Sequence, residues 1–99
     1  MTDKITAIEA TISSLRLQNP RARYADIFEA IGILGRESQP VDRKTIAQRI
    51  RLKTNSMEKP LGKINEKLKA VNSPFRVAMK PRGHKHAYWI VKNPQKEEA

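Results

Sequence analysis

Apolar residues recur along the first two thirds of the chain at the spacing of an α-helix. The first such stripe is formed by Ile5, Ile8, Ile12 and Leu15. Intervals of three and four residues place these side chains on one helical face, so we expect a helix here. Thr2 or Asp3 can cap its start. The Asn19-Pro20 pair ends it, because proline disfavours the α conformation in the residue before it.

Two further helices are predicted downstream. The second stripe is formed by Tyr24, Ile27, Phe28, Ile31 and Leu34. Gly35 is expected to end this helix in a left-handed conformation, and residues 38–40 are expected to form a loop. Asp42 is placed to cap a short third helix over residues 43–51. Its inward side chains would be Ile46, Ala47 and Ile50.

The fourth stripe is the most regular of the chain. It is formed by Met57, Leu61, Ile64, Leu68 and Val71. Proline is tolerated only in the first turn of a helix, so Pro60 predicts a start near Ser56 or Lys59. Because Gly62 weakens the same region, we expect a distorted beginning.

After Pro74 the apolar pattern changes from helical to alternating, which is typical of a half-buried strand. Residues 75–79 form one predicted strand, and residues 87–91, rich in aromatic and β-branched side chains, form a second. Residues 81–85 contain Pro, Gly and cations, and are predicted to be the turn of an antiparallel hairpin. The polar residues 93–99 are predicted to be a flexible tail.

Charge divides the chain into two parts. The 99 residues carry a formal net charge of +10 and include no cysteine, which excludes disulfides and thiol catalysis. Cations and anions balance in residues 1–40, so the whole excess lies in residues 41–99. A neutral scaffold joined to a basic surface indicates a polyanionic partner. The chain has no long apolar run and no signal segment, which favours a cytoplasmic protein outside the membrane.

The order of these elements resembles a winged helix-turn-helix. The most specific match is residues 42–50, Asp-Arg-Lys-Thr-Ile-Ala-Gln-Arg-Ile, which resemble the first helix of the helix-turn-helix unit. Residues 24–27 and the basic hairpin also resemble linker-histone and forkhead winged helices, and Gly83 with Tyr88 resembles response-regulator effector domains. The expected fold is α+β, mainly α, with about four helices followed by a C-terminal hairpin wing. Residues 1–92 would form one domain, with the helix-turn-helix at 42–73 and the wing at 74–92.

The resemblance implies a protein that binds double-stranded DNA as a nucleoid-associated protein or transcriptional regulator. The helix at 56–72 would lie in the major groove, and the wing at 80–86 would reach the minor groove or the backbone. Lys63 can donate to guanine and Asn55 is matched to adenine. The residues expected to contact DNA are Arg43, Lys44, Arg51, Lys53, Asn55, Ser56, Lys59, Lys63, Lys67, Lys80, Arg82, His84 and Lys85.

Other interpretations of the sequence stay open. The basic surface could bind an acidic protein, could bind structured RNA, or could be the incidental face of a structural subunit. The helix at 1–18 could be a homodimer contact. Tyr88 and Trp89 are expected to pack in the core rather than stack on bases. No catalytic group, cofactor or metal is predicted, because His84 and His86 have no neighbouring carboxylate or thiol.

Overall fold

The computed structural model describes residues 2–82 and 85–92, which form four α-helices and three strands. The helices are α1 (Thr2–Gln18), α2 (Tyr24–Leu34), α3 (Arg43–Ile50) and α4 (Glu58–Ala70), with a 3₁₀ turn η1 (Thr54–Met57) before α4. The strands are β1 (Val41–Asp42), β2 (Phe75–Arg82) and β3 (Lys85–Lys92). They form one antiparallel sheet in the order β1-β3-β2. The predicted α+β class is therefore confirmed.

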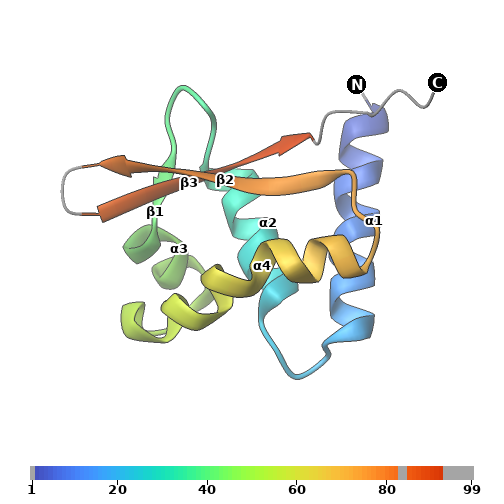
Figure 1. The fold of residues 1–99 in the computed structure, drawn as a ribbon, viewed down its shortest axis with the longest axis horizontal. Helices are drawn as coiled ribbons and strands as arrows, with labels where there is room; N and C mark the ends of the chain where they lie inside the picture. Colours follow the sequence, from blue (N-terminus) through green and yellow to red (C-terminus); the bar gives the residue numbers. More distant parts are fainter. Residues whose placement is uncertain (1, 83–84, 93–99) are drawn as a thin grey trace.

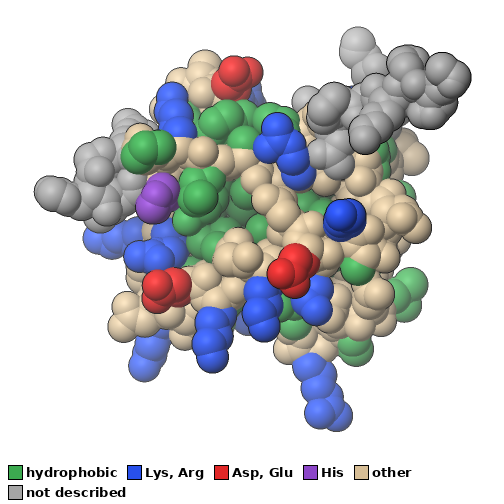
Figure 2. All heavy atoms as spheres, in the orientation of Figure 1, with side chains coloured by type: hydrophobic (Ala, Val, Ile, Leu, Met, Phe, Trp, Pro, Cys, Tyr) green, Lys and Arg blue, Asp and Glu red, His purple; other side chains and the backbone are tan. Residues whose placement is uncertain are grey.

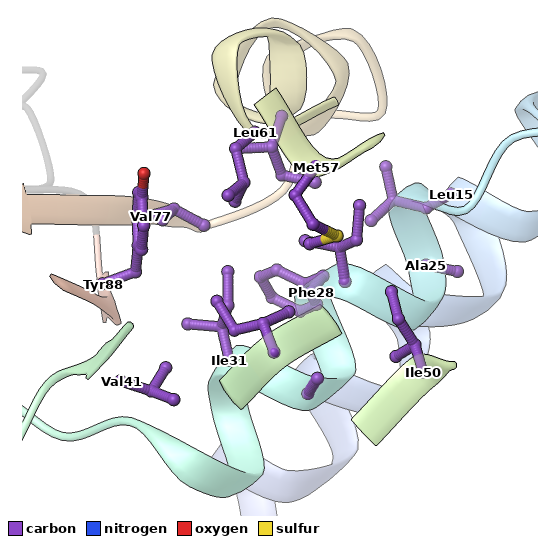
Figure 3. Packing of buried hydrophobic residues seen from close by; sticks show 14 of the residues in the cluster. Leu15, Ala25, Phe28, Ile31, Val41, Ile50, Met57, Leu61, Val77 and Tyr88 are labelled. Carbon is purple, nitrogen blue, oxygen red and sulfur yellow. The ribbon is translucent and has the colours of Figure 1, made fainter. Parts of the chain in front are cut away.

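The sheet and the helices form two layers, with α2 at the centre and α4 lying along β2 (Figure 1). Side chains from every helix and from the sheet meet between the layers (Figure 3). Phe28 of α2 is fully buried at this centre, and its ring lies 6.3 Å from that of Phe75 on β2. A single core therefore joins the helices to the hairpin.

The helical periodicity predicts the helices well. Helix α2 spans the residues of its apolar stripe, and α1 ends at Gln18, just before the Asn19-Pro20 pair. The cap of α3 is also confirmed, because the Asp42 carboxylate accepts a 2.9 Å hydrogen bond from the Thr45 amide. The expected distortion before α4 is present as η1, and Pro60 lies in the first turn of α4, where its missing N–H costs little.

The prediction of a left-handed Gly35 is wrong. Gly35 is extended, with φ −107° and ψ 143°. It is a glycine for a different reason, since a Cβ at this position would lie 2.5 Å from the Tyr88 carbonyl oxygen. The absence of a side chain lets the end of α2 approach the backbone of β3.

The sheet differs from the predicted hairpin in two ways. First, strand β1 was not predicted, because a strand of two residues is too short to show an alternating pattern. In this strand Val41 pairs with Tyr88 and Asp42 pairs with Ala87 of β3. The predicted turn at 81–85 is too long, since the ladder continues through Pro81 to the pair Arg82 and Lys85. Residues 83–84 and the predicted tail at 93–99 lie outside the described residues.

Left-handed residues end α3 and α4. Arg51 has φ 62° and Asn72 has φ 58°. After α3, the Leu52 amide donates a 2.9 Å hydrogen bond to the Ala47 carbonyl. After α4, the Ser73 amide donates a 3.0 Å hydrogen bond to the Leu68 carbonyl. These are the bonds of a Schellman motif, which usually has glycine at the left-handed position. Asparagine tolerates this conformation, whereas arginine carries a cost of about 1–2 kcal/mol there.

One side chain joins α4 to the hairpin. The Asn65 amide donates to the Val77 carbonyl at 3.0 Å, and its oxygen accepts from the Val77 amide at 2.8 Å. Val77 lies on β2, an edge strand of the sheet, so Asn65 takes the place of a neighbouring strand at this point.

Replacing Gly35 with alanine should lower the free energy of unfolding by about 1–3 kcal/mol, because the new Cβ meets a backbone oxygen that cannot rotate away. Gly32→Ala is the matched control: its Cβ would meet only the end of the Ile90 side chain, at 3.1 Å. Urea unfolding of both variants measures the difference. Equal effects would contradict the proposed role of Gly35.

Asn65→Ala should lower the free energy of unfolding by about 1–2 kcal/mol, since two hydrogen bonds are lost. Glu66→Ala, at the exposed neighbouring position of α4, should change it by at most about 0.5 kcal/mol. Hydrogen exchange provides a second measurement, in which the Val77 amide should lose protection in the Asn65 variant alone.

Candidate nucleic-acid interface

The outer side of α4 is the centre of the candidate interface. Met57, Leu61, Ile64 and Leu68 are buried, and the predicted stripe therefore faces the core. Helical geometry then directs the intervening positions outward, and Lys59, Lys63 and Glu66 are exposed. Figure 2 shows a row of Lys and Arg side chains along this part of the molecule.

Gly62 leaves this face of α4 open. A Cβ at Gly62 would meet nothing within 4 Å, so the glycine is not required by packing against the rest of the chain. Glycine costs helix stability relative to alanine, by about 1 kcal/mol. The lack of a side chain gives another molecule close access to the backbone between Lys59 and Lys63.

Polar groups and cations precede α4. Asn55 and Ser56 lie in η1 and are exposed, at the leading end of the helix. Lys53 and Arg51 are exposed in the turn between α3 and η1, and Lys44 is exposed on α3. These predicted residues are thus exposed on the elements that lead into α4.

Arg23, which was not among the predicted site residues, stabilises the turn after α3. The Arg23 guanidinium donates to the Ile50 carbonyl at 2.8 Å and forms a 2.6 Å ion pair with Asp26. A second arginine, Arg16, lies 3.4 Å from the same carboxylate. This network fixes the end of α3, but no sequence pattern connects residue 23 with residue 50.

Two predicted contact residues have partners within the protein. The Lys67 ammonium lies 5.6 Å from the centre of the Tyr24 ring, a cation–π contact that packs α4 against α2. Arg43 is half-buried close to Tyr88. Burial raises the pKa of the Tyr88 hydroxyl, and the nearby positive charge of Arg43 opposes that rise. Both cations therefore lie at junctions between elements.

Of the predicted contact residues in the hairpin, Lys80 is the one whose side chain the structure describes. Lys80 is exposed on β2, and His86 is exposed on β3. The side chains of Arg82 and Lys85, and the whole of His84, lie outside the described part of the structure. A hollow lined by Glu58 and Gly62 of α4 and by Met79 and His86 of the hairpin shows that these two elements adjoin.

The aromatic residues of β3 are not a stacking surface. Tyr88 is buried and belongs to the core, as predicted. The prediction for Trp89 is wrong, because this residue does not belong to the core: it is half-buried, and its indole N–H is buried without a hydrogen-bond partner among the described residues. The described residues contain no group of three or more His, Cys, Asp or Glu placed to hold a metal ion.

No described helix is long and apolar enough to cross a membrane. Comparisons with protein families, with curated proteins and with solved structures find no match to this chain.

Proposed function

We propose that this protein is a winged helix-turn-helix protein that binds double-stranded DNA. The observation that carries the proposal is that two basic elements adjoin: α4, through Glu58 and Gly62, and the hairpin, through Met79 and His86, line one hollow, and they lie side by side in the fold (Figure 1). The strand order β1-β3-β2, with α3 and α4 between β1 and β2 in sequence, supports the same fold.

In the proposed complex, α4 lies in the major groove. Its exposed Lys59 and Lys63 are directed away from the core, where they can donate to guanine acceptors or to phosphates. Asn55 and Ser56 stand at the leading end, the part of a recognition helix that reaches base edges. Gly62 allows the duplex to approach the helix backbone.

The surrounding cations would contact phosphates and supply affinity without sequence information. Arg51, Lys53 and Lys44 lie on the side of α3 and the turn, and Lys80 lies on the hairpin. Lys67 is left out of the proposed contacts because it packs on Tyr24. A regulatory or nucleoid role, a cytoplasmic location and a homodimer through α1 stay predictions, the last of which sedimentation would test.

The double variant Lys59→Ala, Lys63→Ala should weaken duplex binding at least tenfold, about 1.4 kcal/mol. It should also reduce the slope of log K against log salt by about 2, because two cations no longer displace counterions. Fluorescence anisotropy of a labelled duplex at several salt concentrations measures both quantities.

Arg36→Ala, Lys92→Ala is the matched control. It removes the same charge, but from two exposed residues that line a hollow at the other end of β3. Its effect on affinity should be about twofold or less at physiological salt, because distant charges are screened. Equal losses in the two double variants would contradict the proposed orientation. A flat salt response would contradict DNA binding itself, and a preference for structured RNA over the duplex in direct competition would identify RNA as the ligand instead.

Arg51→Gly should change stability and DNA binding in opposite directions. Glycine removes the left-handed strain, which raises the free energy of unfolding by about 1 kcal/mol. Loss of the guanidinium removes a phosphate contact and weakens binding several-fold. Arg51→Ala removes the same charge but keeps the strain, so it should weaken binding equally without the gain in stability. Urea unfolding and anisotropy separate the two effects, and unchanged affinity in both variants would exclude the contact.

A further inference from the structure

A hollow of about 310 Å³ lies between α4 and the hairpin. Figure 2 shows it as a recess with an apolar floor beside the histidine side chain. Its volume is at the lower end of the range for small-molecule sites. Lys59 and Lys63, on the outer side of α4, do not line it. The hollow thus lies beside the proposed recognition surface and shares Gly62 with it.

Apolar side chains form the floor and one wall. Leu61 and Ile64 come from α4, and Val77 and Met79 come from β2. Met79 is 57% exposed and is one of three large apolar side chains that are exposed among the described residues, whereas Met57 is fully buried. Methionine is flexible and adapts to the shape of a bound molecule. An apolar ligand in the hollow would remove this surface from water.

Hydrogen-bond donors also line the hollow. Tyr88 pairs with Met79 across the hairpin, and His86 is two residues along the same strand, so all three side chains share one face of the sheet. Arg43 is close enough for its charge to act on the Tyr88 hydroxyl. A guanidinium and a phenol hydroxyl that converge on one space are matched to the oxygens of a carboxylate.

Glu58 limits the charge of the ligand. It is the single carboxylate of the lining and is exposed in the first turn of α4. Arg43 and Glu58 together leave little net positive charge in the hollow, which disfavours a dianion such as phosphate. A ligand with one negative charge and an apolar body satisfies both the donors and the floor.

We propose that this hollow binds a small organic monocarboxylate, with its carboxylate toward Arg43 and Tyr88 and its apolar body against Leu61 and Met79. Occupation would neutralise Arg43 beside the hairpin and fill the space between the hairpin and α4. It would therefore weaken binding to DNA, a consequence that rests on the proposed function; binding of the acid itself does not.

Methyl NMR of the protein without DNA tests the site directly. Benzoate is titrated into protein labelled at the methionine methyl groups. The Met79 methyl should shift saturably in the millimolar range, whereas the fully buried Met57 methyl should stay in place and report an intact fold. Benzamide, which has the same shape without the charge, should bind about tenfold more weakly, and inorganic phosphate should leave the Met79 methyl unshifted.

Variants identify the groups that hold the carboxylate. Arg43→Gln should weaken benzoate binding about tenfold, because the lining loses a positive charge. Glu58→Gln should strengthen benzoate binding, because the lining loses a negative charge. Arg36→Gln, outside the hollow, should have no effect. The proposal is overturned if benzoate gives no saturable shift at Met79, if benzamide binds as well as benzoate, if phosphate binds more tightly, or if Arg43→Gln binds benzoate normally. A protein that binds benzoate but no duplex would refute the proposed function and leave this site standing.

Discussion

The two hydrogen bonds between Asn65 and Val77 are the constraint on which the arrangement of the site depends. Apolar contacts hold α4 on the core, but they are non-directional and would permit the helix to slide or rotate by a small amount. An amide that donates to one backbone group and accepts from another fixes a single position. The position of α4 relative to β2 is therefore fixed, as the proposed recognition of a rigid duplex requires.

The turn before α4 shows a second constraint, and it costs stability. Arg51 occupies a left-handed position that glycine would occupy without strain. The Arg23 guanidinium holds the preceding Ile50 carbonyl, so the turn keeps its shape despite this cost. Strained positions are often kept where a side chain has a function. A cation at the tip of this turn is consistent with the proposed phosphate contact.

Periodicity was sufficient to predict the helices and the buried side of α4, because each apolar stripe is local in sequence. Features set by tertiary contacts were not predictable. The close approach of Gly35 to Tyr88, the pairing of β1 with β3 and the bond from Arg23 to Ile50 each join residues far apart in the chain. For the same reason the sequence indicated Lys67 as a surface cation, although Tyr24 on another helix holds it.

The contact between α4 and β2 also determines how the sheet ends. The N–H and C=O groups of Val77 point away from β3, toward Asn65. In an antiparallel strand every second residue points the same way, so the backbone groups of Phe75, Met79 and Pro81 also point outward. The Phe75 amide donates a 3.1 Å hydrogen bond to the Ser73 hydroxyl oxygen, and the Val77 amide donates to the Asn65 side chain. Pro81 has no amide hydrogen. Of the three outward N–H groups, that of Met79 has no partner among the described residues. Few donors on this edge are thereby left for β-addition by another strand, which disfavours edge-to-edge aggregation.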